Sequence, residues 1–256
     1  MVFVTGDCHA EFLKLNTHYF PEQKELTRDD FVIICGDFGG VWNNSAREKY
    51  WLNWLNDKHF TTLFVDGNHE NFDLLSAYPV VDFHGGKVHQ VRENVYHLMR
   101  GYCFDLCGKT FFAFGGASSH DIDDGILDPM EFSSMDDFRD TVKRYDRQQK
   151  LFRVKGYSWW PQELPSDEEM RRGTQTLAQR NMSVDFVISH CLPQRIAAMR
   201  GFTQPDTLTT YFDSLIDENN PNGCLKFGDW YCGHYHMDEN ITPEYHVLYY
   251  DLVRIV

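Results

Sequence analysis

Metal-binding side chains stand close together near the start of the chain, in the stretch TGDCHAEF at residues 5–12. Asp7, Cys8 and His9 are side-chain types that bind metal ions well, and they follow an apolar run typical of a buried strand. Three interpretations are open from this stretch alone: zinc ligands, a thiol redox site, or ordinary loop residues.

Similar polar residues follow apolar runs elsewhere in the chain. Runs at 2–4, 31–35, 62–65, 186–189 and 231–232 each end in a polar turn. Continuous apolar runs are typical of central strands covered on both faces, and open α/β sheets place their sites at the carboxyl ends of such strands. Each short motif is weak alone, but the series in this order is highly specific. The residues are Asp7, His9, Asp37, Asn68, His69, His190, His234 and His236.

Helical patterns separate these runs. Residues 44–57 and 205–218 each carry an apolar stripe at helical spacing, which predicts two helices with one side facing the core. Two strand-like runs within 94–115 flank Cys107-Gly108, which predicts a hairpin turn, and residues 245–256 are typical of closing strands. The stripes are Tyr50, Trp51, Trp54 and Leu55 in the first helix, and Leu208, Phe212, Leu215 and Ile216 in the second.

Residues 117–182 do not follow this alternation of apolar runs and helical patterns. The segment is charged, contains Trp159-Trp160-Pro161, and is predicted to form two helices. The second helix has a start signal in Ser166 followed by Glu169, a capping box. We interpret the segment as an insertion that covers the active-site side of a single domain spanning residues 1–256.

Composition limits the possible classes of function. With 256 residues, 42% of them hydrophobic, the chain can bury a sizeable core. A formal net charge of -14 repels nucleic-acid backbones, so no strong binding to nucleic-acid polymers is expected, whereas it suits a protein that holds cations. The N-terminal residues lack a signal-peptide pattern and no apolar run has membrane-spanning length. On this basis the seven cysteines are predicted to be reduced thiols, and the protein is predicted to be cytoplasmic with no membrane partner.

The polar turns closely resemble the sequence blocks of the calcineurin-like metallophosphoesterase superfamily, which have the forms D-x-H, G-D, G-N-H-[DE], a later H, and G-H-x-H. Here they stand as GDCH at 6–9, GD at 36–37, GNHE at 67–70, SH at 189–190 and GHYH at 233–236. The resemblance covers residues 2 to about 236, and every block keeps its ligand-type residues. FGGASSHD at 114–121 and YSWWPQELPSDEE at 157–169 are also similar to a bacterial and phage-encoded subset of this superfamily.

The resemblance implies an α/β fold, a four-layer αββα sandwich of two mixed β-sheets, with two divalent metal ions. Manganese is expected first, with iron or zinc as alternatives, because imidazole, carboxylate and amide ligands suit these ions. A hydroxide that bridges the two ions would attack phosphorus in line. The implied ligands are Asp7, His9 and His236 for one ion, Asn68, His190 and His234 for the other, and Asp37 as the bridge.

His69 and Glu70 complete the implied catalytic set with Asp37. The resemblance assigns His69 as a general acid near the leaving group, the alternative being a hydrogen-bonding support. Ser/Thr phosphatases of the superfamily carry GDxxDRG in the second block, whereas this chain has GDFGGVW, with Gly40 in place of the second aspartate and no arginine. The usual partner of His69 is therefore missing, and Glu70 or a residue of the insertion is expected to replace it.

The insertion supplies candidate substrate-binding residues. Trp159 and Trp160 are interpreted either as a hydrophobic clamp or as an aromatic wall beside the metals. Arg153 is a candidate for phosphate binding, although such charges often lie on solvated surfaces, and Asn68 is a candidate for substrate binding as well as a ligand.

The predicted function is hydrolysis of a phosphomonoester or phosphodiester, with a small or nucleotide-like substrate favoured. The alternatives are a phosphoprotein Ser/Thr phosphatase, which Gly40 disfavours, and a non-catalytic protein-binding scaffold, which the retained ligands disfavour. Nothing in the sequence indicates an oligomeric state. Alternation along an extended segment predicts that Asp7 and His9 point one way and Cys8 the other, so Cys8 is expected to be a packing residue rather than a ligand.

Overall fold

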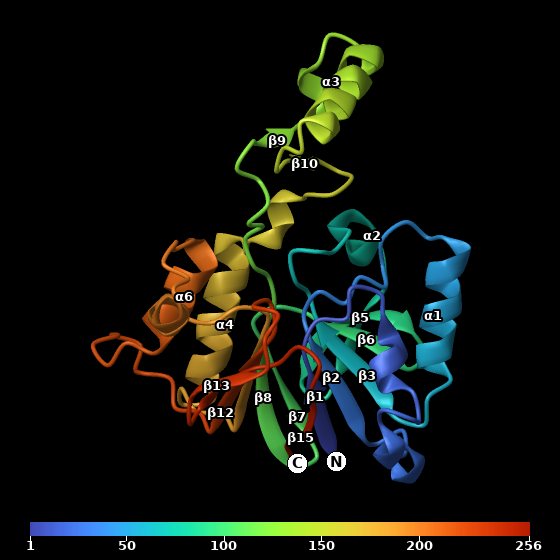
Figure 1. The fold of residues 1–256 in the computed structure, drawn as a ribbon. Helices are drawn as coiled ribbons and strands as arrows, with labels where there is room; N and C mark the ends of the chain where they lie inside the picture. The colour runs from blue at the N-terminus through green and yellow to red at the C-terminus, as the bar shows by residue number, and fades with distance from the viewer.

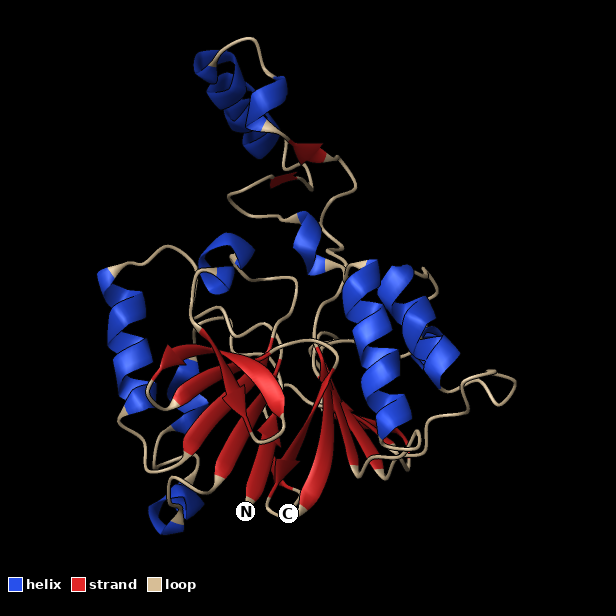
Figure 2. Ribbon diagram, turned by 180° about the vertical axis from the view of Figure 1, so that it is seen from behind, coloured by secondary structure: helices blue, strands red, loops and turns tan.

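Two mixed β-sheets lie at the centre of the computed structural model, which describes residues 1–256 (Figure 2). The first sheet has seven strands, in the spatial order β15 (Leu252–Arg254), β1 (Val2–Thr5), β2 (Phe31–Cys35), β3 (Thr61–Val65), β6 (Val95–Leu98), β5 (Gly86–Arg92) and β4 (Val80–Phe83). The second has six, in the order β13 (Glu239–Thr242), β14 (Tyr245–Val247), β12 (Asp229–Cys232), β11 (Phe186–Ser189), β8 (Lys109–Phe114) and β7 (Tyr102–Leu106).

All five apolar runs form strands in the parallel centres of these sheets. In the first sheet β1, β2, β3 and β6 pair in parallel. In the second, β8, β11, β12 and β14 do the same. Because parallel strands end at the same edge of a sheet, the polar turns that follow them meet on one side of the molecule.

Both faces of the central strands are buried, as their continuous apolar runs predict. In β2, Phe31, Ile33 and Cys35 face the space between the two sheets. Val32 and Ile34 face the helices on the other side. Three clusters of buried residues, one between the sheets and one under each helix layer, therefore build the expected four-layer αββα sandwich (Figures 1 and 2).

Helices cover the outer faces of the sheets. None of them is both long and apolar enough to cross a membrane. The α-helices are α1 (Ala46–Asn56), α2 (Phe72–Ser76), α3 (Met135–Arg147), α4 (Asp167–Gln179), α5 (Gln194–Ala197) and α6 (Thr207–Leu215). Short 3-10 helices span Phe12–Leu15, Pro21–Glu25, Pro129–Glu131, Pro161–Glu163 and Ala198–Arg200.

The apolar stripes predicted for α1 and α6 agree with the structure to different extents. In α6 the prediction is confirmed, since Leu208, Phe212 and Leu215 are buried. In α1 the prediction is wrong for Tyr50, which is 61% exposed. Leu52 and Leu55 face the core instead, and a residue two positions before Leu52 points to the opposite side of a helix with 3.6 residues per turn.

The hairpin at Cys107-Gly108 is confirmed, but the run before it is not one strand. Both turn residues have positive φ, 50° and 75°, as the tight turns that match the twist of β-hairpins require. The preceding run holds β6 and β7, which belong to different sheets. The chain changes sheets at Gly101, whose φ of 80° and close approach to Gly173 exclude a side chain. Cys103 packs in the core, whereas Cys107 is exposed in the turn.

Residues 117–182 have two structurally different parts. The predicted capping box of Ser166 and Glu169 is present and begins α4, which packs on the six-stranded sheet through Gly173 and Leu177. Residues 120–158, called the arm below, contain α3 and the short strands β9 (Ile126–Leu127) and β10 (Arg153–Val154). The arm projects away from the sandwich at the edge where the parallel strands end (Figure 1).

Candidate metal centre

Three predicted ligands form a tight triangle at this edge. Oδ2 of Asp7 lies 3.1 Å from Nε2 of His236 and 3.6 Å from Nε2 of His9. The two histidine nitrogens are 3.2 Å apart. Ligands bound to one ion at about 2.0–2.2 Å are separated by about 3.0–3.5 Å, so this triangle has the dimensions of a metal site.

Asp37 lies between this triangle and a second group. Its Oδ2 is 3.8 Å from Nε2 of His9, and its Oδ1 is 3.3 Å from Nε2 of His190. The ring of His234 lies 4.9 Å from that of His190. Asp37 therefore has the position that a carboxylate shared by two ions needs.

Buried atoms without hydrogen-bond partners test whether metal ions fit the site. Such atoms are uncommon in proteins because an unpaired buried polar group costs free energy. Three of the unpartnered side-chain atoms in this structure belong to predicted ligands: Oδ2 of Asp7, Oδ1 of Asn68 and Nε2 of His190. All three are lone-pair donors that a cation would satisfy, so the donor set fits the expected ions.

Glycines in the motifs leave room for the carboxylates. Oδ1 of Asp37 accepts a hydrogen bond from the amide of His69 at 2.8 Å, and a Cβ on Gly67 would lie 2.0 Å from that oxygen. Oδ1 of Asp7 accepts from the amide of His234 at 2.9 Å, and a Cβ on Gly233 would lie 2.0 Å from it. Each aspartate thus uses Oδ1 to bind the backbone of another motif, which fixes the carboxylate. In Asp7 this turns Oδ2 to His9 and His236, whereas in Asp37 Oδ1 also faces His190 and Oδ2 faces His9.

Left-handed backbone conformations occur at several site residues. The φ angles are 45° at His9, 42° at Asp37, 70° at His234 and 51° at His236. Such angles strain residues with a side chain and are concentrated at functional sites. Cys8 is buried in the core, as expected of a packing residue. The turn at His9, rather than strand alternation, sends Asp7 and His9 in the same direction.

Buried charges polarise the cluster. Burial by itself lowers the pKa of His190, but the charges of Asp37 and Asp7 outweigh it and raise the pKa to about 10. For Asp37 burial raises the pKa, and the charge of His190 lowers it well below its usual range. Nδ1 of His190 lies 2.8 Å from the carbonyl of Cys35, so this nitrogen carries the proton and Nε2 is directed at the cluster. In the absence of a metal, a proton on Nε2 balances the carboxylates.

The structure separates His69 from Glu70. Oε1 of Glu70 accepts a hydrogen bond from the amide of Phe38 at 2.7 Å, and no hydrogen bond joins Glu70 to His69. Nε2 of His69 instead lies 3.4 Å from Nη2 of Arg153. Of the two partners expected for His69, the residue from the insertion is therefore the one in contact. Burial, together with the charge of Asp37, raises the pKa of Glu70 well above its usual value.

Arg153 reaches His69 from the arm. Its guanidinium forms a two-bonded ion pair with Asp121, at 2.8 Å from Nε and 2.7 Å from Nη2, and donates to the carbonyl of Ser158 at 3.1 Å. Two arm segments thus hold one cation beside the cluster. Burial lowers the pKa of His69, the charge of Asp37 opposes this, and the charge of Arg153 adds to the lowering.

Trp160 does not line the metal cluster. It is buried, its Nε1 donates to Asp73 at 2.8 Å, and its ring packs edge-to-face on Trp42 at 5.5 Å. These contacts favour the clamp interpretation for Trp160. The indole nitrogen of the half-buried Trp159 has no hydrogen-bond partner.

His120 is a site residue that the sequence interpretation overlooked. Its Nε2 lies 2.8 Å from Nε2 of His234. It lies outside the five recognised sequence blocks, and its partner His234 is 114 positions away in the chain. Its position in FGGASSHD, directly after an apolar strand like the recognised motifs, was the signal that could have identified it.

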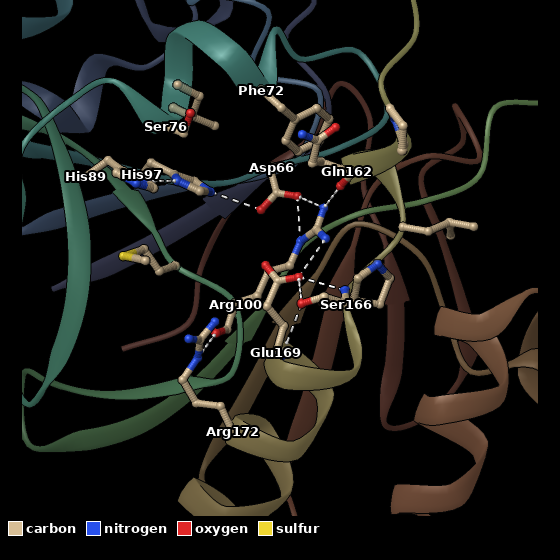
Figure 3. Close-up of a pocket in the computed structure, with 15 residues that line it drawn as sticks. Asp66, Phe72, Ser76, His89, His97, Arg100, Gln162, Ser166, Glu169 and Arg172 are labelled. Carbon is tan, nitrogen blue, oxygen red and sulfur yellow. Dashed lines mark hydrogen bonds and ion pairs between the residues drawn. The ribbon is translucent and has the colours of Figure 1, made fainter.

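A second overlooked group supports the loop that carries Asn68 and His69 (Figure 3). Asp66 directly precedes this loop and is buried. Its carboxylate binds Arg100, with Oδ2 2.9 Å from the guanidinium Nε, and binds His97 at 3.0 Å. Burial raises the pKa of Asp66, and the charge of Arg100 lowers it well below the usual range. Arg100 also donates to the carbonyl of Gln162 at 2.8 Å, which joins this loop to the base of the insertion.

Comparison with known proteins agrees with this geometry. Residues 1–238 match the family model of the calcineurin-like phosphoesterases. A lariat debranching enzyme A from Xenopus laevis is 28% identical over 172 residues, which cover 60% of this chain and 30% of that protein. The chain therefore spans about a third of the length of this relative. A family match over almost the whole chain shows that this protein belongs to the calcineurin-like phosphoesterase family.

Proposed function

We propose that this protein hydrolyses small or nucleotide-like phosphodiesters at a centre of two divalent cations. The observation that carries the proposal is the set of three buried, unpartnered ligand atoms, on Asp7, Asn68 and His190. The carboxylate of Asp37, which lies between His9 and His190, supports it. One cation would be held by Asp7, His9 and His236. The other would be held by Asn68, His190 and His234, with Asp37 between them.

When bound, the two cations would neutralise phosphoryl oxygens and lower the pKa of the attacking water, leading to displacement in line with the departing oxygen. Nitrogen and oxygen ligands without thiolate suit manganese first, and iron or zinc as alternatives. Asn68, whose Oδ1 lacks a partner, would also position the substrate's phosphoryl group.

His69 and Arg153 are proposed to act as a pair. Arg153 carries five N–H donors and no acceptor, so Nε2 of His69 accepts in their contact and the imidazole is neutral at rest. An entering phosphoester would attract the guanidinium to its oxygens and release Nε2. His69 could then take up a proton and give it to the oxygen of the departing alcohol.

Charge supports a diester over a monoester. Arg153, the arginine that contacts the cluster, is also paired with Asp121, so its charge is partly neutralised and suits the single charge of a diester better than the double charge of a monoester. The relative named as a lariat debranching enzyme is in line with this preference. Gly40 disfavours a Ser/Thr phosphatase further, because a side chain there would lie 2.4 Å from the ring of Phe38.

Hydrolysis of two model esters tests the proposal. Purified protein with added manganese is expected to cleave bis-p-nitrophenyl phosphate faster than p-nitrophenyl phosphate, with about two metal ions bound per chain in the same preparation. No hydrolysis of either ester together with no bound metal would instead favour the non-catalytic scaffold. A preference for the monoester would restore the phosphatase alternative.

Two wider expectations stay predictions. A cytoplasmic location is supported by the cysteines, all seven of which are free thiols. Membership of the bacterial and phage-encoded subset rests on the FGGASSHD and SWWP segments. The structure gives the first of these a role, since it carries His120 and Asp121 into the site.

A further inference from the structure

A pocket of about 350 Å³ opens beside the metal cluster on the α1 side of the seven-stranded sheet. His9 and His69 belong to its lining, together with Trp42 and Trp51. Its volume is at the lower end of the range of about 300–1,000 Å³ typical of small-molecule sites. The pocket thus has room for one ring-sized group attached to a phosphate in the cluster.

Backbone rather than side chains forms part of the pocket lining at Gly39 and Gly40. A Cβ on Gly40 would lie 2.4 Å from the ring of Phe38, and one on Gly39 would lie 2.8 Å from the amide nitrogen of Ala10. No side chain fits at either position without displacing its neighbours. The space beside His69, where Ser/Thr phosphatases carry an aspartate, is consequently left open.

Trp42 is held rigidly at the edge of this space. Its ring packs edge-to-face on Trp160 at 5.5 Å, and Trp160 is itself anchored to Asp73 at 2.8 Å. Its backbone carbonyl accepts a hydrogen bond from Nδ2 of Asn71 at 2.7 Å. Trp42 nevertheless stays half-buried, so part of its surface remains available. An aromatic surface that is fixed beforehand binds a ring at little cost in conformational entropy.

The charges around the pocket are already compensated. Arg47 pairs with Glu11, and the carboxylate of Glu48 accepts hydrogen bonds from the amides of Asn43 and Asn44 at 2.8 and 3.0 Å. No unpaired cation is left to bind a second phosphate. Aromatic surface beside compensated polar groups favours a neutral heteroaromatic ring.

We propose that this pocket binds the nucleobase of the leaving nucleoside of a phosphodiester, by stacking on Trp42. This inference rests on the proposed function, because the general-acid role of His69 decides on which side of the phosphate the leaving nucleoside lies. In the reaction a water oxygen bonds to phosphorus, the bond from phosphorus to the nucleoside oxygen breaks, and His69 gives that oxygen its proton. The departing oxygen therefore lies next to His69, and the base attached to its sugar extends into the adjoining pocket.

Adenosine binding to the intact 256-residue chain tests the proposal separately from turnover, since adenosine contains no phosphate. Isothermal titration of adenosine, with ribose as a control ligand, would compare the wild type with Trp42→Ala, Trp42→Phe and Trp54→Ala. Trp54 is a matched control because it is a half-buried tryptophan of α1 outside the pocket lining. We expect Trp42→Ala to weaken adenosine binding about tenfold or more, and Trp42→Phe to keep most of the affinity. Trp54→Ala should have no effect, and ribose should not bind detectably.

Equal affinity of Trp42→Ala and Trp54→Ala for adenosine, or ribose binding as tight as that of adenosine, would overturn the pocket assignment. Because Trp42 packs on Trp160, circular dichroism of Trp42→Ala is needed, and the Phe variant gives a folded comparison if the Ala variant fails. Adenosine binding at Trp42 without hydrolysis of any ester would keep the pocket and reject the proposed function. Diester hydrolysis together with adenosine binding that does not depend on Trp42 would keep the proposed function and reject the pocket assignment.

Discussion

The two halves of the metal centre differ in their access to water. In the half built by Asp7, His9 and His236, the histidine side chains are 31% and 52% exposed. In the other half the side chain of His190 is fully buried, and Oδ1 of Asn68 is enclosed without a partner. Solvent can reach the two histidines of the open half when no ion is bound, but it does not reach Oδ2 of Asp7, which is buried without a partner. The buried half depends on a cation or a proton at His190 as well as at Asn68.

This difference indicates separate roles for the two proposed ions. A cation in the buried half replaces hydrogen bonds that the fold does not supply, so its binding should be coupled to stability. A cation in the open half can exchange with solvent at a smaller cost in the free energy of unfolding. The open half also lies beside His69 and the pocket at Trp42, where the substrate is proposed to enter.

Removing the charge of Asp37, which is proposed to bridge the two halves, should have the largest effect on metal content and turnover. Asp37→Asn keeps the size of the side chain but loses the anionic bridge, so we expect loss of at least one bound ion and a fall in kcat of about a thousandfold or more. Metal analysis and diester hydrolysis on one preparation would measure both. Asp29→Asn, at an exposed position, is the control; retention of both ions by Asp37→Asn would show that Asp37 is no bridge.

His69→Ala separates proton transfer from metal holding. We expect both ions to remain bound while kcat falls about a hundredfold to ten-thousandfold, because a positioned general acid contributes an effect of this size. Metal content and kcat at several pH values are the measurements. Loss of an ion from this variant would contradict the general-acid role and place His69 among the ligands.

Ligand removal from each half compares them directly. His236→Ala should weaken binding of one ion without changing the melting temperature of the metal-free protein. His190→Ala should abolish binding of the other ion and change that melting temperature as well, since it empties a fully buried position. Titration calorimetry and thermal unfolding of both variants check this. Indistinguishable behaviour of the two variants would remove the distinction between open and buried halves.

The pH dependence of the stability of the metal-free protein tests whether the buried half needs a proton when no cation is bound. The pKa of His190 is raised from its ordinary value of 6.5 to about 10 in the folded protein. The stability from its proton is therefore fully present below pH 6.5 and is lost as the pH rises towards 10, on the order of 5 kcal/mol. Chemical unfolding of metal-free protein between pH 6 and pH 10 would show this decline. With metal bound the decline should be absent, because the cation takes the place of the proton; a decline of equal size would exclude this explanation.

Glu70→Gln should have the smallest effect. Burial raises the pKa of Glu70 well above its usual value, which favours the neutral form, and glutamine is a neutral group of the same shape. We expect turnover to change less than about threefold, as for a side chain that accepts a hydrogen bond from the backbone amide of Phe38. A loss of a hundredfold or more in kcat, with metal content unchanged, would return Glu70 to the catalytic set.

Local pattern was sufficient to predict the strands and the ligand motifs. A strand buried on both faces needs a continuous apolar run, and a turn that binds metal needs ligand side chains beside glycine, so both appear within a few residues. This explains why the runs ending at Asp7, Asp37, Asn68, His190 and His234 could be recognised along the chain.

Pairings between distant segments were decided only by the tertiary structure. The contact of His120 with His234, the ion pair of Asp66 with Arg100 and the approach of Arg153 to His69 join residues 114, 34 and 84 positions apart. Such contacts depend on how loops from both sheets meet at one edge, which no local spacing records. Glu70 shows the same limit, since its neighbour in sequence, His69, lies in the site while Glu70 itself is bound beneath the loop at Phe38.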